Sequence, residues 1–185
     1  NDNDFTEITL SALRGNYGYV DIDSRVHSPE VEDICRRKNI SVIRSSHHFS
    51  GIPEDAGEIL RNLPKQPGEI PKIACMVNGT VELFRLAALG RESVHRRQII
   101  IGMGTYGVPS RLLPEHFRSI LSYSTAGRRP AAPGHITPGE MVETYRFRET
   151  DKQTEVFGII GNPVLHSGSP AIHNPGFRRS GIDAV

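Results

Sequence analysis

The sequence has little of what marks several large classes of proteins. Its two cysteines, Cys35 and Cys75, cannot build a disulfide framework. Its 22 basic and 21 acidic residues leave no net field to attract nucleic acid or an anionic membrane. No apolar run approaches the length that spans a bilayer. We therefore expect a soluble protein of a reducing, cytoplasmic setting, with no nucleic-acid or membrane partner.

The amino terminus also lacks familiar features. The chain begins Asn-Asp-Asn-Asp, without an initiator methionine and without the basic and apolar regions of a signal peptide. We expect it to be a piece of a longer chain. Its 185 residues, 37% of them hydrophobic, suit one globular domain, or one domain and part of another.

What the sequence does contain is an alternation of strand and helix patterns. Short apolar, β-branched runs occur at 19–23, 41–44, 72–76, 98–103, 119–124 and 155–160. Helical patterns lie between them at 28–38, 53–62, 81–90, 110–116 and 138–146. Strands that are apolar on both faces predict a parallel sheet covered by helices, either a (β/α)8 barrel or a doubly wound sheet. About five such units precede residue 140.

A change of composition near residue 150 predicts a domain boundary. Residues 146–154 are polar and charged, and a new strand pattern, VFGIIG, begins at Val156. We therefore predict two domains, at 1–150 and 151–185. The second has only about 30 residues, which are too few to bury a core of their own.

Lys72 lies in the apolar strand pattern EIPKIACM. At the carboxyl end of a barrel strand it would face the active-site mouth, and apolar surroundings would lower the pKa of its amine. Such an amine can attack a carbonyl and form an imine. The alternative is a lysine at the strand end whose stem carries the ammonium group to water.

Two histidines and an arginine follow other strands. His47 and His48 come after the run at 41–44, where a histidine can act as a general acid or base. Neighbouring residues on a strand point to opposite faces, so at most one of them can face a shared pocket, and we expect no metal site. Arg111, after the strand at 98–103, can clamp a carboxylate or can be an ordinary first-turn residue of a helix.

The run Gly102-Met-Gly-Thr-Tyr-Gly107 fits the glycine pattern of a dinucleotide-binding turn. That function needs a helix running from the glycines and an acidic residue about 20 positions further on. Pro109 and Pro114 limit the helix, and the strand ending near 123–128 carries no acid. These features argue against a nicotinamide site here.

Four motifs, taken in order, resemble one family, the type I 3-dehydroquinate dehydratases. They are SSHHF at 45–49, PKIACM at 71–76, MGTYGVPSRL at 103–112 and APGHI at 132–136. The family fold is a (β/α)8 barrel, so the resemblance implies that this chain holds the fourth to eighth strands. It also implies that earlier strands, before Asn1, supply an acidic residue that orients the histidine and arginines that bind substrate.

The resemblance implies a role for each matched residue. Lys72 would form an imine with the ketone of 3-dehydroquinate. His47 would take the C2 proton and help the C1 hydroxyl leave as water. Arg111 would bind the substrate carboxylate, and His135, where the family has glutamine, would contribute a hydrogen bond, although Ala131 replaces a usual serine. The products would be 3-dehydroshikimate and water, with no metal or organic cofactor.

The tail resembles the start of a second family, the shikimate dehydrogenases. Residues 156–174 read VFGIIGNPVLHSGSPAIHN, and by this resemblance Ser167 and Ser169 would bind the shikimate carboxylate. Alternatively, Ser169-Pro170 is an ordinary helix start. Pro175 would interrupt the expected helix. The NADP-binding domain would lie beyond this chain.

Together, the two resemblances imply part of a bifunctional dehydratase/shikimate dehydrogenase of aromatic amino-acid biosynthesis, located in the cytoplasm, or in plastids for a plant parent. Its partner would be a small-molecule substrate, and its oligomeric state stays open. Two other hypotheses remain. One is a non-catalytic module that binds shikimate-like carboxylates through Arg111 or through Ser167 and Ser169. The other is an NADP-dependent oxidoreductase.

Overall fold

The fold is an α/β arrangement around one parallel sheet. A computed structural model describes residues 2–125, 134, 136–161, 164 and 167–185. Its strands are β1 (Tyr19–Asp23), β2 (Ser41–His48), β3 (Ile70–Met76) and β4 (Ile99–Met103), paired in that order. All three pairings are parallel, which agrees with the alternation of strand and helix patterns.

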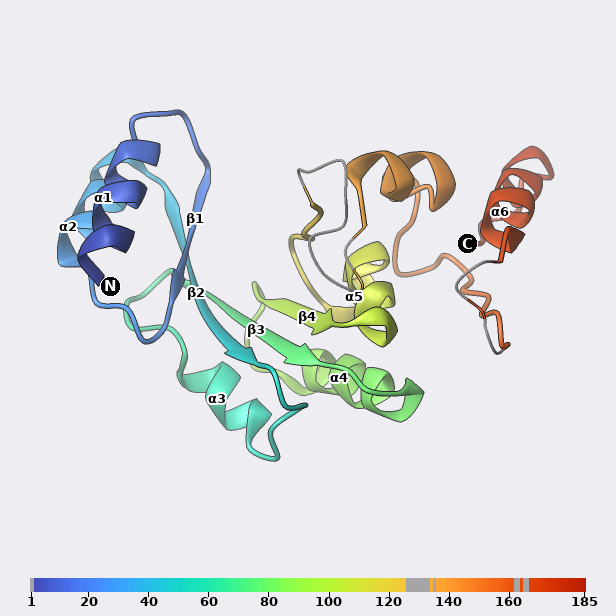
Figure 1. Cartoon of the computed structure of the whole chain (residues 1–185), viewed down its shortest axis with the longest axis horizontal. Helices are drawn as coiled ribbons and strands as arrows, with labels where there is room; N and C mark the ends of the chain where they lie inside the picture. Colours follow the sequence, from blue (N-terminus) through green and yellow to red (C-terminus); the bar gives the residue numbers. More distant parts are fainter. Residues whose placement is uncertain (1, 126–133, 135, 162–163, 165–166) are drawn as a thin grey trace.

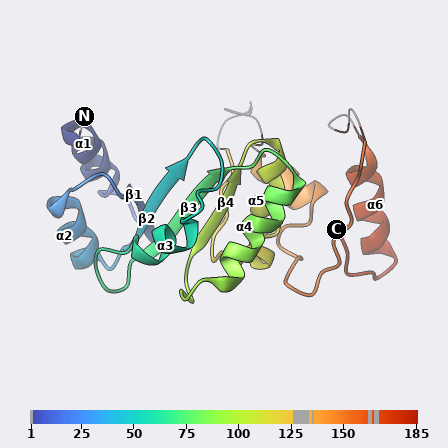
Figure 2. The same ribbon diagram turned by 90° about the horizontal axis from the view of Figure 1, so that it is seen from below.

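The helices lie at the two ends of the sheet and on one of its faces. They are α1 (Asp2–Ala12), α2 (Pro29–Lys38), α3 (Ala56–Asn62), α4 (Thr80–Glu92), α5 (Val108–Leu112) and α6 (Ser169–Arg179). Figure 1 shows α1 and α2 beside β1 and β2, and α6 beyond β4, away from the sheet. In Figure 2, α3 and α4 cover one face of the strands. None of the helices in the described residues is long and apolar enough to cross a membrane.

The two faces of the sheet bury different clusters. Ile73, Cys75 and Ile100 pack against Leu60 of α3 and Leu86 of α4. Side chains alternate along a strand, so the intervening residues point to the opposite face. There Ile43, Ile70, Ala74, Ile99 and Ile101 form a second cluster, against which Leu121 and Tyr123 pack. This second face carries the candidate site.

Two predicted strands are wrong. At 119–124 one backbone bond, from Ile120 N to Gln98 O at 3.0 Å, joins the segment to the residue just before β4. The Ser119 hydroxyl replaces the backbone as the next partner of β4, because it accepts from Ile100 N at 2.8 Å and donates to Ile100 O at 3.2 Å. At 155–160 only Glu155 forms a bridge, with Ala184. The described sheet therefore has four strands rather than five before residue 140.

Several helix predictions also need correction. The predicted helix at 110–116 divides into α5 and a 3₁₀ helix, Pro114–Phe117, because the residue before a proline disfavours the helical conformation. The helix at 138–146 contains a short π-helix, Glu140–Thr144. The sequence patterns missed α1. Helix α6 continues through Pro175 to Arg179, so the predicted interruption at Pro175 is wrong. Within this helix, Asn174 donates from its side chain to Thr144 O at 2.9 Å.

Candidate active site

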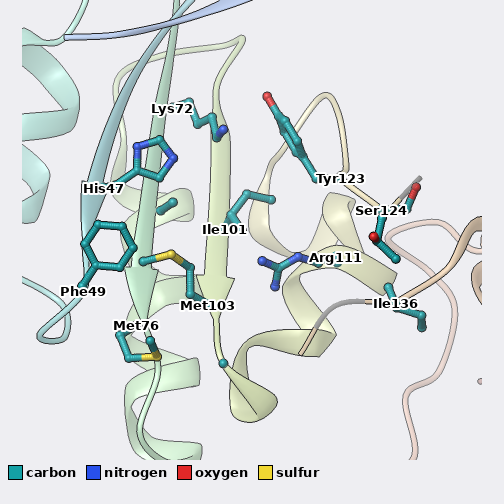
Figure 3. A pocket seen from close by; sticks show the side chains of 13 residues that line it. His47, Phe49, Lys72, Met76, Ile101, Met103, Arg111, Tyr123, Ser124 and Ile136 are labelled. Carbon is teal, nitrogen blue, oxygen red and sulfur yellow. The ribbon is translucent and has the colours of Figure 1, made fainter. Parts of the chain in front are cut away.

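A cavity of about 610 Å³ opens at the carboxyl ends of β2, β3 and β4, on the face opposite α3 and α4. Side chains from three elements bring chemically active groups to it: His47 from β2, Lys72 from β3 and Arg111 from α5. Figure 3 shows these side chains with Tyr123 around one space. Met103, Ile101 and other apolar residues complete the lining. The three residues predicted to act together therefore share one cavity.

Lys72 lines this cavity from the amino-terminal half of β3 (Ile70–Met76), so its expected place at the carboxyl end of the strand is wrong. It is only 6% exposed, so its stem does not carry the amine into open solvent, and the interpretation as an ordinary strand-end lysine is wrong. Its Nζ donates to Asp21 Oδ2 at 2.5 Å and lies 4.1 Å from the ring centroid of Tyr123. The sequence pattern predicts purely apolar surroundings for Lys72, and this prediction is wrong. A carboxylate and the face of an aromatic ring contact the amine.

His47 and His48 point to opposite faces of β2, as predicted. His47 lines the cavity, and its ring stacks on Phe49 with 6.4 Å between centroids. His48 turns away, and its Nε2 lies 2.9 Å from Ser46 Oγ. In the described part of the chain, His, Cys, Asp and Glu side chains form no group of three that could hold a metal ion.

Asp23, at the end of β1, is a site residue that the sequence reasoning missed. Its Oδ2 lies 3.5 Å from His47 Nδ1. The Arg25 guanidinium holds both carboxylate oxygens, at 2.8 and 3.0 Å, and chiefly through this bond lowers the pKa of Asp23 to about 2. The carboxylate is therefore charged at neutral pH and can orient the imidazole. An acidic partner for His47 thus lies within this chain.

Arg111 reaches the cavity from α5 and is 6% exposed. One of its terminal nitrogens, Nη1, donates to Gly102 O, and Ser122 Oγ donates to the Arg111 carbonyl at 2.6 Å. Burial lowers the pKa of the guanidinium from its usual range. A buried guanidinium with few solvent contacts attracts a carboxylate strongly.

The glycines at 102–107 serve close packing. A Cβ on Gly107 would lie 2.2 Å from the carbonyl carbon of Gly102. Ser110 Oγ closes this turn, because it accepts from Gly102 N and donates to Gly107 O, both at 2.7 Å. The following helix, α5, has only five residues. This geometry positions Arg111 and does not form the long helix that a dinucleotide turn needs.

The remaining predicted residues lie elsewhere. His135 and Ala131 are outside the described residues. Gly134, next to His135, packs on the cavity rim, since a Cβ there would be 2.1 Å from Gly104 O. Ser167 and Ser169 are at the start of α6, where Ser167 Oγ donates to Ser169 Oγ at 2.9 Å, and neither lines the cavity.

Comparison with known proteins agrees with this arrangement. A sequence model of the family described as type I 3-dehydroquinase matches residues 1–152. The bifunctional 3-dehydroquinate dehydratase/shikimate dehydrogenase, chloroplastic, of Arabidopsis thaliana is 29% identical over 189 residues, covering 100% of this chain and 31% of the relative. The 3-dehydroquinate dehydratase of Aquifex aeolicus is 34% identical over 136 residues, 72% of this chain and 60% of the relative.

Solved structures show the same likeness. The type I 3-dehydroquinate dehydratase of Clostridium difficile, crystallised with covalently modified comenic acid, superposes with a TM-score of 0.65. It is 25% identical, and the match covers 80% of this chain and 61% of that one. The chain therefore spans less than two thirds of the length of each of these relatives.

Proposed function

Because this chain belongs to the type I 3-dehydroquinase family, we propose that it carries the imine-forming face of a 3-dehydroquinate dehydratase. One observation supports the proposal most strongly. A buried amine, an imidazole and a buried guanidinium, from Lys72, His47 and Arg111, line one cavity at the carboxyl ends of parallel strands. A ketone that also carries a carboxylate fits this set of groups.

The proposed reaction begins with attack of Lys72 Nζ on the C3 ketone of 3-dehydroquinate, with loss of water to give a protonated imine. The iminium group draws electrons from the neighbouring C2–H bond, and His47 takes the proton. The electron pair then expels the C1 hydroxyl, which leaves as water after protonation by His47. Hydrolysis of the imine releases 3-dehydroshikimate. The iminium is the electron sink, so the reaction needs no metal or organic cofactor.

The described contacts support these roles. Asp23 lies beside His47 Nδ1, which favours the tautomer with a proton there and leaves Nε2 as the basic nitrogen. Arg111, on another wall, is placed to receive the substrate carboxylate. By the resemblance, His135 would add a hydrogen bond to bound substrate.

The test is formation of the conjugated product from 3-dehydroquinate, followed by ultraviolet absorbance. Lys72→Met should reduce kcat by a factor on the order of 10⁴ or more, because the nucleophile is lost. Arg111→Ala should mainly raise KM. Lys65→Met, which alters an exposed lysine, is the matched control and should retain activity. Substrate binding by calorimetry without any product would instead favour the non-catalytic carboxylate-binding module.

We further propose that residues 151–185 begin a second, shikimate dehydrogenase-like domain. Glu155 N donates to Asp183 O, and Val185 N donates to Glu155 O. The segment before α6 and the segment after it in the sequence therefore pair in parallel. Large apolar side chains are exposed on this unit, as expected if more chain packs over it: Val156, Phe157, Ile159, Ile160, Ile172 and Ile182. The Arabidopsis relative, named as bifunctional, matches 100% of this chain.

This second proposal is tested in the longest natural form of the protein by NADP-dependent oxidation of shikimate. Ser167→Ala and Ser169→Ala should each raise the KM for shikimate, because a hydroxyl that binds the carboxylate is lost. Ser180→Ala, at the other end of α6, is the control and should leave KM unchanged. Equal KM values in all variants would mean that these serines only begin the helix.

A further inference from the structure

Asp21 has an unusual position for a residue with no assigned role. Its Oδ2 atom accepts from Lys72 Nζ at 2.5 Å and from the Tyr123 hydroxyl at 3.1 Å. The partners are 51 and 102 residues away in the sequence, so the fold, and not local geometry, brings them together. In Figure 3 the ends of Lys72 and Tyr123 approach each other deep in the cavity.

Strand register places Asp21 beneath the amine. Lys72 is level with Ser45 on β2 and Asp23 on β1, because these residues pair across the sheet. Asp21 lies two residues nearer the amino end of β1, whereas His47 lies two residues beyond Ser45, toward the mouth. A substrate that enters from the carboxyl ends of the strands therefore meets His47 on the mouth side of Lys72. Asp21 stays in contact with Lys72 Nζ on the side away from the mouth.

Tyr123 fixes this carboxylate. Burial, together with the neighbouring Asp21 charge, raises the pKa of the Tyr123 hydroxyl well above its usual range. The phenol therefore stays protonated and acts as a permanent hydrogen-bond donor to Asp21. Its ring also faces Lys72 Nζ, at 4.1 Å from the centroid, which favours a cation at that place.

Imine formation requires an acceptor for a proton at this nitrogen. An ammonium group has no lone pair, so Lys72 must give up one proton before it attacks a ketone. Later the imine nitrogen must carry a proton, because only an iminium cation is an effective electron sink. A carboxylate in direct contact with the nitrogen can serve both requirements.

Resting on the function proposed above, we propose that Asp21 is a further catalytic residue that takes the Lys72 proton and then faces the iminium, with Tyr123 as its positioning residue. Asp21 accepts one proton from the ammonium, and the freed lone pair forms the N–C bond as the C=O electrons move to oxygen. A second proton passes from nitrogen to that oxygen. Asp21 returns its proton to the hydroxyl, which leaves as water, and the nitrogen lone pair completes the C=N bond. Two ammonium protons thus leave with the ketone oxygen, and one stays on the iminium.

This arrangement predicts an unusual pH dependence. Transfer within the Lys72–Asp21 pair does not change the net protonation of the protein, so the rate of imine formation should be flat between about pH 6 and 8. Without the carboxylate, solvent must remove the proton, and the rate should rise about tenfold per pH unit. Among the other titratable groups, His47, Arg111 and Tyr123 line the same cavity as Lys72, and Asp23, which Arg25 holds, is level with Lys72 in the strand register.

The experiment is rapid-quench borohydride trapping with 3-dehydroshikimate, read by intact mass. This compound is already dehydrated, so the trapping rate reports imine formation alone. The wild type should give a trapping rate that is flat over pH 6–8. Asp21→Asn should trap on the order of 100-fold more slowly at pH 7, with a rate that rises with pH. Tyr123→Phe keeps the ring and should slow trapping by roughly 3- to 10-fold with a flat profile. Asp33→Asn changes an exposed carboxylate on α2 and should match the wild type.

The outcomes separate the two proposals. No wild-type adduct on Lys72 would contradict the proposed function itself. A wild-type adduct with an unchanged rate and profile in Asp21→Asn would overturn only the role of Asp21. If circular dichroism shows that Asp21→Asn does not fold, the wild-type profile decides, since a tenfold rise per pH unit there would exclude proton transfer to Asp21.

Discussion

Asp23 shows how an ion pair with Arg25 can keep a carboxylate charged beside His47. Arg25 contacts both oxygens of this carboxylate, and His47 lies 3.5 Å from one of them. Because its pKa is held near 2, Asp23 remains an anion across the pH range in which histidine titrates. The orienting contact to His47 therefore persists whether or not the imidazole is protonated.

This lowered pKa makes a prediction about acid stability. The folded-state pKa of Asp23 lies below its ordinary value of 3.8, so its contribution to stability is full above pH 3.8 and is lost as the pH falls toward 2. The free energy of unfolding of the wild type should exceed that of Asp23→Asn at pH 6, and the difference should shrink between pH 4 and 2. Urea titrations at several pH values measure it. A difference that is independent of pH would contradict the ion-pair account.

The sequence could indicate some site residues because their positions on strands carry meaning. His47 and Arg111 each follow an apolar run, Lys72 begins the run at 72–76, and family motifs surround all three. Asp21 and Tyr123 gave no such signal, because their role depends on a contact between residues 102 apart. The alternation in YVDID does place two carboxylates on one face near a strand end, and this pattern was the available clue.

At the scale of elements, a buried ion triad joins α2, β2 and the start of β3. Arg44 on β2 has no solvent exposure, and its guanidinium contacts Glu32 Oε1 at 2.8 Å and Glu69 Oε1 at 2.5 Å. Both acids are largely shielded as well. Removal of the arginine would leave two carboxylates without their cation in a site of low polarity.

Arg44→Met should therefore lower the free energy of unfolding by about 3–5 kcal/mol, as measured by urea denaturation. Arg36→Met is the matched control, because Arg36 pairs with Asp33 in an exposed position on α2. That change should cost no more than about 1 kcal/mol. Similar losses in the two variants would show that the triad does not stabilise the elements it joins.

The turn between β4 and α5 depends on glycine for close packing. Gly107→Ala would place a Cβ 2.2 Å from a backbone carbon of Gly102, so the turn that carries Arg111 must shift. We expect a loss of about 1–3 kcal/mol in stability, together with a raised KM. Gly139→Ala is the control, since Gly139 has helical dihedral angles and open space around it. A normal KM in Gly107→Ala would show that the position of Arg111 does not depend on this turn.

Element predictions failed where tertiary contacts replaced backbone ladders. The runs that became β3 and β4 are apolar on both faces, and their side chains pack into one cluster on each side of the sheet. The run at 119–124 has the same appearance, yet the Ser119 hydroxyl bonds both polar atoms of Ile100 and ends the ladder. Hydrophobic pattern alone does not contain that information.

For the molecule as a whole, the segment after residue 145 is tied to the rest and is not a plain linker. Arg146, in a left-handed backbone conformation, donates to Glu149 Oε2 and to Ala184 O, both at 3.1 Å. Asn174 on α6 donates to Thr144 O at 2.9 Å. These bonds join Asn174 and Ala184 to the chain at 144–146.

Arg146→Ala should loosen this attachment. The amides of Glu155, Phe157 and Val185, which form the bonds between the two extended segments, should exchange hydrogen roughly tenfold faster. Amides of β3 should be unaffected, because they lie in a different cluster. Arg148→Ala, at an exposed position two residues away, is the control. Unchanged exchange in Arg146→Ala would mean that apolar packing alone fixes the unit.

The central claim is that Lys72 forms an imine with a cyclic ketone, and borohydride reduction in the presence of 3-dehydroquinate tests it most directly. Peptide mass analysis should place the mass of the reduced ligand on Lys72 and leave the other lysines, Lys38, Lys65 and Lys152, unmodified. An adduct that is absent, or that is spread over those exposed lysines, would contradict the account.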